Sequence, residues 1–305
     1  MAGNAPAIHT QDLAKKYGHV TALAGLTMTV PKGEVFGFLG PNGAGKTTSV
    51  KLLLGLTEPT SGQAWLLGSP IGDRQVRRRI GYLPELFRYQ SFLTAREVLG
   101  LHCELARIPR AERRGEVAAA LSTVGLTERA DDRCGTFSKG MQQRLGLGVA
   151  LLGKPELIFL DEPTSALDPV GRHDVREITR RLRERGTTIF LNSHLLSEVE
   201  LVCDRVAVVD HGRVIAMGSI PELLGGSKLV RVRLTGLNGK LGQLNGFGTP
   251  AEDGEWVTFR DLGDDQVPEL VAAIVGLGGR VYAVEPQLQS LEDRFLQLLK
   301  EEEDK

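Results

Sequence analysis

The chain has 305 residues, of which 41% are hydrophobic and 25% are charged, and its formal net charge is −1. This length accommodates one large α/β domain and a small second domain, and the balanced charge excludes a global basic field that would hold nucleic acid. No apolar run approaches the roughly 20 residues of a membrane-spanning helix, and Met1–Gln11 lacks a secretory signal pattern. Cys103, Cys134 and Cys203 lack C-x-x-C spacing, which indicates reduced thiols that act as small buried hydrophobes.

The first predicted element that carries chemistry is a buried strand, Val35–Leu39, followed by a glycine-rich loop and a helix over Thr48–Leu54. The loop reads G-P-N-G-A-G-K-T and fits the phosphate-binding pattern G-x-x-x-x-G-K-[ST] at every defined position. Backbone N–H groups of such a loop surround an anion at the positive end of the helix dipole. We expect Lys46 to reach the outer phosphates and Thr47 to hold Mg²⁺. The full expected nucleotide-binding set from this loop is Gly40, Pro41, Asn42, Gly43, Ala44, Gly45, Lys46, Thr47 and Thr48.

The rest of the first 225 residues predicts an α/β domain with a helical insert over about residues 86–152. Strand-like apolar runs alternate with helical patterns, as expected for a largely parallel sheet with covering helices. The expected helices of the insert are Ala95–Ala106, Ala111–Val124 and Met141–Leu152. The expected elements after it are strands at Leu157–Leu160, Thr188–Leu191 and Val206–Val209, and a helix at His173–Arg185.

Two carboxylates follow the apolar run Leu157–Leu160 directly. Because a buried strand delivers the residues at its end to the edge of the sheet where ligands bind, Asp161 and Glu162 are expected in the nucleotide site. Asp161 would hold Mg²⁺, and Glu162 would activate the water that attacks the γ-phosphorus. The sequence therefore predicts an ATPase that uses ATP and Mg²⁺.

Three further motifs surround these carboxylates: F-S-K-G-M-Q-Q-R at Phe137–Arg144, S-A-L-D at Ser165–Asp168, and N-S-H at Asn192–His194. With the phosphate loop, this order resembles the nucleotide-binding subunit of an ABC transporter over about residues 8–224. The resemblance implies a P-loop NTPase fold of the ABC type. It also implies a head-to-tail dimer that encloses two ATP molecules, each between the phosphate loop of one copy and the signature motif of the other.

The resemblance implies roles for five further residues. Tyr17 would stack on adenine, against the alternative of a surface tyrosine in a β-hairpin. Ser138 and Gly140 would contact the partner's γ-phosphate. Asp168 would link the two sites across the dimer, and His194 would contact the γ-phosphate and position the attacking water.

Three positions depart from the usual family pattern. Lys139 and Met141 replace the first glycine and the glutamine of the signature L-S-G-G-Q, and Glu85 replaces a glutamine that senses Mg²⁺. A carboxylate binds Mg²⁺ as well, so the metal role is expected to survive at Glu85. Such departures resemble ABC-2-type export ATPases of the drug-resistance and antibiotic-export kind.

Residues 228–305 are expected to form a small α+β accessory domain after a hinge at Gly225–Ser227. We expect strands at Leu229–Leu234, Glu255–Arg260 and Gly279–Val284, and helices at Gln266–Val275 and Ser290–Leu299. We also expect a loop at Asn245–Gly254 and an exposed acidic tail at Glu301–Lys305. The segment S-L-E-D-R-F at Ser290–Phe295 resembles the end of many subunits of this export family, and it predicts a serine-capped amphipathic helix.

The sequence as a whole favours an ATP-hydrolysing motor of an ABC export system. It would work as a homodimer docked on a separately encoded membrane permease, in the cytoplasm at the inner face of the cell membrane, with no nucleic-acid partner. The docking surface is expected between Glu85 and about Arg110, where Phe87, Tyr89, Phe92 and Leu93 serve either docking or internal packing. The alternative is a soluble ABC ATPase that acts on ribosomes or DNA, but the chain has one phosphate loop and no sustained heptads. The cargo is not encoded in these motifs.

Overall fold

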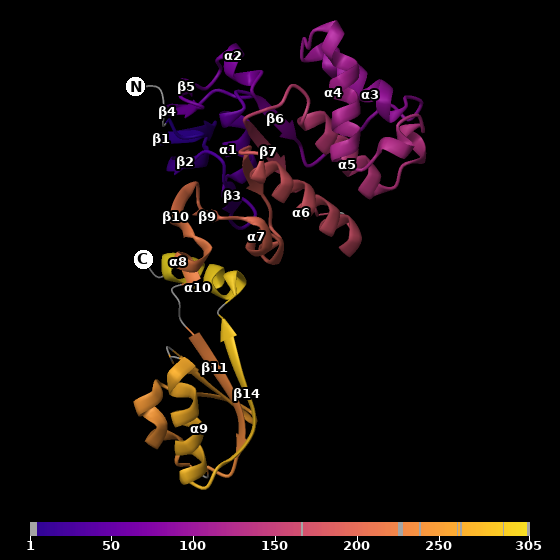
Figure 1. Ribbon diagram of the computed structural model, residues 1–305. Helices are drawn as coiled ribbons and strands as arrows, with labels where there is room; N and C mark the ends of the chain where they lie inside the picture. Colours follow the sequence, from indigo (N-terminus) through magenta and orange to yellow (C-terminus); the bar gives the residue numbers. More distant parts are fainter. Residues whose placement is uncertain are drawn as a thin grey trace. The chain divides into compact units, whose positions relative to one another are not determined.

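A computed structural model describes residues 5–165, 167–224, 228–237, 239–260, 262, 264–288 and 290–303 (Figure 1). The chain divides into two compact units, Met1–Ser219 and Ile220–Lys305. The expected hinge at Gly225–Ser227 lies outside the described residues. In the described part of the chain, no helix has the length and apolar character needed to cross a membrane.

A six-stranded sheet forms the centre of the first unit. Its strands in spatial order are β10 (Arg213–Ser219), β9 (Arg205–Asp210), β3 (Val35–Leu39), β8 (Thr188–Asn192), β7 (Leu157–Asp161) and β6 (Ile80–Leu83). All are parallel except the edge strand β10, and every residue of β3, β7 and β8 is buried, as their continuous apolar runs predict. The predicted α/β class and these buried strands are confirmed.

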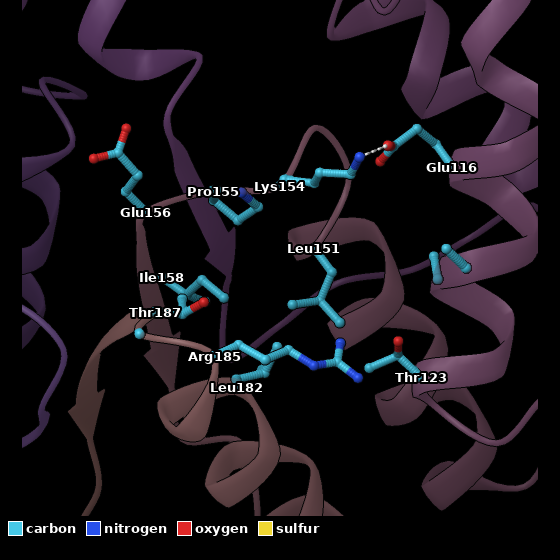
Figure 2. A pocket seen from close by; sticks show the side chains of 13 residues that line it. Glu116, Thr123, Leu151, Lys154, Pro155, Glu156, Ile158, Leu182, Arg185 and Thr187 are labelled. Carbon is cyan, nitrogen blue, oxygen red and sulfur yellow. Dashed lines mark ion pairs between the residues drawn. The ribbon is translucent and has the colours of Figure 1, made fainter.

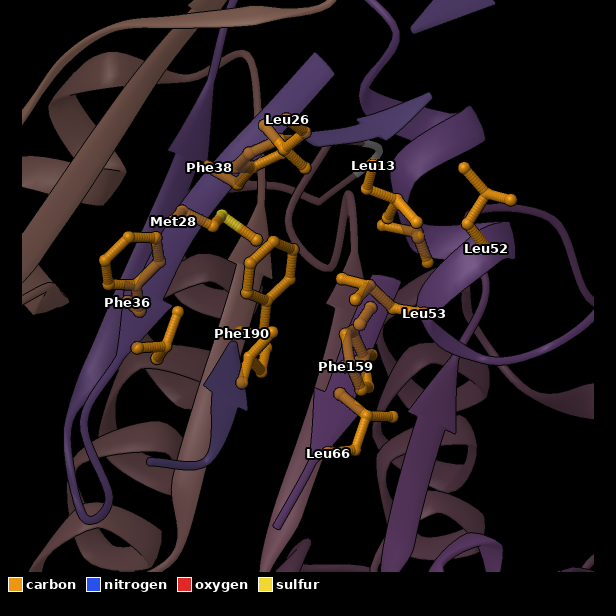
Figure 3. Packing of buried hydrophobic residues seen from close by; sticks show 14 of the residues in the cluster. Leu13, Leu26, Met28, Phe36, Phe38, Leu52, Leu53, Leu66, Phe159 and Phe190 are labelled. Carbon is orange, nitrogen blue, oxygen red and sulfur yellow. The ribbon is translucent and has the colours of Figure 1, made fainter. Parts of the chain in front are cut away.

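A second, antiparallel sheet in the first unit was not predicted, although a β-hairpin at Tyr17 was considered as an alternative. Its strands in spatial order are β2 (Val20–Val30), β1 (Ile8–Tyr17), β4 (Ser61–Leu66) and β5 (Ser69–Pro70). Its apolar residues share one core with the central sheet and α1 (Lys46–Leu53). Figure 3 shows Leu26 and Met28 beside the phenylalanines of the central sheet, where the Phe190 ring lies 5.1 Å from Phe38 and 5.3 Å from Phe159. This core fixes the strand that precedes the phosphate loop.

The helical insert lies at the β6 edge of the central sheet, with α5 (Lys139–Ala150) in contact with β6 (Figure 1). The expected helices are present, and two of them have side-chain caps at their starts. The Thr94 side chain and Glu97 form a capping box at the start of α3 (Ala95–Leu105). Ser138 caps α5, which therefore begins at Lys139, two residues before the predicted start. The elements of the helical insert are α3 (Ala95–Leu105), α4 (Arg110–Thr123), the 3₁₀ turns η1 (Thr127–Arg129) and η2 (Cys134–Thr136), and α5 (Lys139–Ala150).

Three other helices belong to the first unit: α2 (Arg74–Arg77), α6 (Pro169–Glu184) and α7 (Leu196–Val202). Helix α6 begins four residues before the predicted His173, because the Asp168 side chain accepts from the Gly171 N–H at 2.7 Å and Pro169 occupies the first helical position. Cys103 and Cys134 are buried, as expected for small hydrophobic residues, whereas Cys203 is only half-buried.

The second unit contains a four-stranded antiparallel sheet with its own hydrophobic core. Its strands in spatial order are β12 (Ala251–Asp253), β13 (Trp256–Arg260), β11 (Lys228–Thr235) and β14 (Arg280–Leu288). The helices are α8 (Ile220–Leu224), η3 (Leu241–Phe247), η4 (Asp264–Gln266), α9 (Val267–Gly276) and α10 (Leu291–Glu303).

One expectation for this unit is wrong. Residues 245–254 are not simply a loop, because η3 extends through Phe247 and β12 pairs with β13 over Ala251–Asp253. The acidic end is helical through Glu303, and the Arg294 guanidinium donates to Glu301 at 3.1 Å across that last stretch; residues 304–305 lie outside the described residues. The predicted serine cap of α10 is present: the Ser290 hydroxyl accepts from the Asp293 N–H at 3.1 Å.

Candidate functional site

The candidate site lies at the carboxyl ends of neighbouring parallel strands. In the sheet, β3, β8, β7 and β6 follow one another in that order. The phosphate loop follows β3, His194 comes two residues after β8, Glu162 follows β7, and Glu85 comes shortly after β6. Strand order therefore brings together four segments that are far apart in the sequence.

The phosphate loop joins β3 to α1, as predicted. Lys46 is buried, and its Nζ donates to the Gly40 carbonyl at 2.6 Å and to the Pro41 carbonyl at 3.0 Å. Burial lowers the pKa of Lys46, and the nearby carboxylates of Glu162 and Asp161 act in the opposite direction. The ammonium group thus lies between the loop and the carboxylates that end β7.

Glycine is required in this loop for two separate reasons. Gly43 and Gly45 have left-handed backbones, with φ of 86° and 95°. A Cβ on Gly45 would also lie 2.4 Å from the Ala22 carbonyl oxygen, whereas one on Gly43 would meet nothing within 4 Å. The backbone of β2 therefore packs directly against the end of the phosphate loop.

Asp161 ends β7 and is 4% exposed. Its Oδ1 accepts a hydrogen bond of 2.5 Å from Asn192 Nδ2, at the position paired with it in β8. Burial raises the pKa of Asp161, the Asn192 hydrogen bond lowers it, and the nearby charge of Glu85 raises it again. Asn192 was expected only as part of the motif that contains His194, and the structure shows that it orients this carboxylate.

Glu162 and His194 form a hydrogen-bonded pair: His194 Nδ1 lies 2.7 Å from Glu162 Oε2. Glu162 has a left-handed φ of 51°, which turns its side chain off the line of β7, and its N–H donates to the Asn192 carbonyl at 2.8 Å. Burial raises the pKa of Glu162, and the His194 hydrogen bond lowers it. The Glu162 side chain is only 10% exposed, whereas that of His194 is 54% exposed. A shielded carboxylate beside an accessible imidazole is a suitable arrangement for proton transfer.

Oxygen-bearing residues in this site suit Mg²⁺. Asp161 and Glu85 are close enough for their charges to interact, and Thr47 lies at the start of α1. The described residues contain no cluster of three histidine, cysteine or acidic side chains that could hold a metal by themselves. Mg²⁺ commonly uses one or two carboxylates and completes its coordination with substrate phosphates and water, so this donor set fits an ion that arrives with a nucleotide.

The signature segment lies on a different element from the phosphate loop. Helix α1 packs against β2 and β4, whereas α5 packs against β6, α3 and α4. At the start of α5, the Ser138 hydroxyl accepts from the Met141 N–H at 3.3 Å, so Lys139, Gly140 and Met141 form its first turn. Asp168 caps α6 in the same way. Tyr17 is 48% exposed at the tip of the β1–β2 hairpin, with Lys15 Nζ 5.0 Å from its ring centre.

Comparison with known proteins matches residues 23–165 to the ABC transporter family. An ABC transporter ATP-binding protein of Nostoc sp. is 41% identical, over 98% of this chain and 92% of the relative. The linearmycin resistance ATP-binding protein of Bacillus subtilis is 38% identical over 76% of each chain. The bacitracin transport ATP-binding protein of Bacillus licheniformis is 42% identical over 68% of each chain.

Two solved structures have a similar fold. One is an ATP-binding subunit of an ABC transporter, with 31% identity and a TM-score of 0.65 over 72% of this chain and 92% of that one. The other is a dimeric ATP-binding cassette in a post-hydrolysis state with ADP and phosphate, with 25% identity and a TM-score of 0.63 over 70% of this chain and 98% of that one. Sequence similarity over nearly the whole length, together with this shared fold, shows that the chain belongs to the ATP-binding proteins of ABC transporters, a family of ATPases.

Proposed function

We propose that the protein is the motor subunit of an ABC export system, which hydrolyses ATP as a dimer docked beneath a separately encoded permease. One observation carries this proposal: Lys46, Asp161 and the Glu162–His194 pair lie at the same edge of the central sheet. Together these residues would supply a phosphate-binding cation, a metal-binding carboxylate and a base for one nucleotide, which supports the proposal.

In the proposed reaction, backbone amides of residues 40–48 hold the ATP phosphates and Lys46 leaves the loop carbonyls to bind the outer ones. Thr47, Asp161 and Glu85 would hold Mg²⁺, which neutralises developing charge on the phosphates. Glu162 accepts the proton of the attacking water. Burial raises the pKa of Glu162, which favours acceptance of this proton, and His194 positions both the Glu162 carboxylate and the attacking water. Tyr17 stacks on adenine from the exposed hairpin tip.

The proposed dimer completes each site with the signature segment of the other copy. The separation of α1 from α5 within one chain supports this, as does the dimeric arrangement of the post-hydrolysis relative. Ser138, Lys139, Gly140 and Met141 lie at the N-terminal end of a twelve-residue helix, where the helix dipole attracts phosphate. Asp168, at the start of α6, is proposed to link the two sites.

The proposed permease-docking surface is a groove between the central sheet and the helical insert. It has a volume of about 580 Å³ and is lined by Arg74, Arg77, Arg78, Ile80, Gly81, Tyr82, His102, Leu105, Ala106, Arg107, Ile108, Val149, Ala150, Leu152 and Gly153. None of these is acidic, so an acidic amphipathic segment of the permease complements the groove. Part of the expected docking region instead packs internally: the Phe87 and Tyr89 rings lie 5.4 Å apart and Tyr89 contacts His102 edge-on, whereas Phe92 is 68% exposed.

The proposed direction is export, because relatives are named for linearmycin resistance and for Nod factor export. The proposed location is the cytoplasmic face of the membrane, through the permease. No observation favours the alternative of action on ribosomes or DNA.

The test is affinity purification of the Glu162→Gln protein from solubilised membranes, followed by mass spectrometry. We expect a polytopic permease to co-purify. Reversing the groove charge with Arg74→Glu and Arg78→Glu should release that permease and leave ATP binding intact. A matched control is Arg114→Glu with Arg133→Glu, two arginines that do not line the groove. Recovery of ribosomes or DNA-repair factors without a membrane protein would contradict the proposed function.

A further inference from the structure

A second pocket lies at the edge of the central sheet opposite to the ATP site. Pro155 and Glu156 immediately precede β7, and Thr187 immediately precedes β8; all three line this pocket. Because β7 and β8 are parallel, their amino ends meet at one edge and their carboxyl ends, with Asp161 and Asn192, meet at the other. The pocket is therefore separate from the nucleotide site.

The walls of this pocket come from both the helical insert and the core of the unit. Two small side chains of α4, Ala119 and Ala120, line the pocket. Larger side chains line it as well: Leu151, which follows α5, Ile158 of β7 and Leu182 of α6 (Figure 2). The short alanine side chains leave a space of about 420 Å³ between α4 and the larger side chains. This volume lies within the range of roughly 300–1,000 Å³ that is typical of small-molecule sites. The interior is thus apolar and large enough for a small organic ligand.

Of the described charged side chains that line the pocket, one cation, Arg185, is available to bind a ligand. Glu116 accepts from the Gly153 N–H at 3.2 Å and lies 3.4 Å from Lys154 Nζ, and Glu156 binds Arg79 through two hydrogen bonds of 2.6 and 2.7 Å. Both carboxylates are therefore neutralised by protein groups. Arg185 has no side-chain partner among the described residues, and Figure 2 shows it extended toward Thr123 along one edge of the pocket.

We propose that this pocket binds an apolar monocarboxylate, with its hydrocarbon part between α4 and α6 and its carboxylate on Arg185. A guanidinium group holds a planar carboxylate through two parallel hydrogen bonds, which makes this head group the best match to the single free cation. A bound ligand contacts the insert and the core together. Because it binds only the folded protein, it also raises the unfolding temperature.

The experiment is isothermal titration calorimetry of the full chain without nucleotide, with decanoate as the probe and decan-1-ol and decylamine as probes of equal chain length. We expect decanoate to bind at one site per chain, and at least about tenfold more tightly than either of the other probes, because only the carboxylate pairs with Arg185. Equal binding of all three probes, or no binding of decanoate, would overturn the proposal.

Two variants locate the site. Arg185→Gln should weaken decanoate binding at least about tenfold, whereas the control Arg181→Gln, in the last turn of α6 and outside the pocket, should not change it. Ala119→Leu should weaken binding by narrowing the space beside α4. Since Ala119 and Arg185 are exposed, their variants should keep the melting temperature of the unliganded protein. Undiminished binding by both variants would show that decanoate binds elsewhere and would refute the assignment.

Discussion

The contact between the phosphate loop and β2 leads to a quantitative prediction for two glycines. Gly43 and Gly45 both have left-handed backbones, so alanine at either position costs about 1–2 kcal/mol in backbone strain. The reduced entropy of the unfolded chain offsets part of this cost equally in both variants. Only at Gly45 does the new Cβ also meet backbone, at 2.4 Å from the Ala22 oxygen.

Relief of that overlap requires β2 or the loop to move, at about 1–3 kcal/mol, the usual cost of overpacking. Gly45→Ala should therefore lower the free energy of unfolding by about 2–5 kcal/mol, against about 1–2 kcal/mol for Gly43→Ala. Urea unfolding followed by tryptophan fluorescence measures both. The chain has two tryptophans, Trp65 in the first unit and Trp256 in the second, so a Trp256→Phe background restricts the signal to the first unit. Equal losses for the two variants would refute the role of the β2 contact.

Three further predictions concern the carboxylates and the helix cap. Glu162→Gln should bind ATP but release phosphate about 10²–10⁴ times more slowly, and unchanged turnover would exclude Glu162 as the base. Asn192→Leu should cost about 1.5–3 kcal/mol of unfolding free energy at neutral pH. Because losing this hydrogen bond raises the pKa of Asp161 further, the cost should shrink as Asp161 is protonated at lower pH; a pH-independent loss would contradict this. Asp168→Ala should remove the α6 cap and lower the free energy of unfolding by about 0.5–2 kcal/mol, whereas Asp168→Asn should keep the cap and the melting temperature. Equal melting temperatures for the alanine and asparagine variants would argue against the cap.

Continuous apolar strands and motifs with fixed spacing are the parts that the sequence predicted well. The strands β3, β7 and β8 are buried on both faces, so their residues form unbroken apolar runs that are easy to recognise. The strands β1 and β2 were not predicted, because β-bulges interrupt the alternation of apolar and polar residues along them and Asp12 has a left-handed φ of 46°. The short strand β12 is fully exposed, so no hydrophobic pattern marks it.

In the candidate site, too, some features were predicted from the sequence and others were not. Local motifs identify the phosphate loop and the residues after β7, since each motif includes the strand that positions it. The role of Asn192 depends on the pairing of β7 with β8, which brings together residues 31 positions apart. The hydrogen bond between His194 and Glu162 depends on the same pairing. Neither contact could be predicted from spacing along the chain. The roles of Tyr17 and of the signature residues depend on a nucleotide and a second copy, and they stay predictions.

The most direct test of the central claim is the ATPase activity of mixed variants. Lys46→Ala should inactivate the phosphate loop of its own chain, and Ser138→Arg should inactivate the site of the opposite copy. In a mixed dimer both lesions fall in one site and the other site is intact. An equal mixture of the two inactive proteins should therefore recover about a quarter of the wild-type phosphate release, since half of the dimers are mixed and each has one working site. A mixture that stays as inactive as its separate components would contradict the composite ATP site and, with it, the proposed motor.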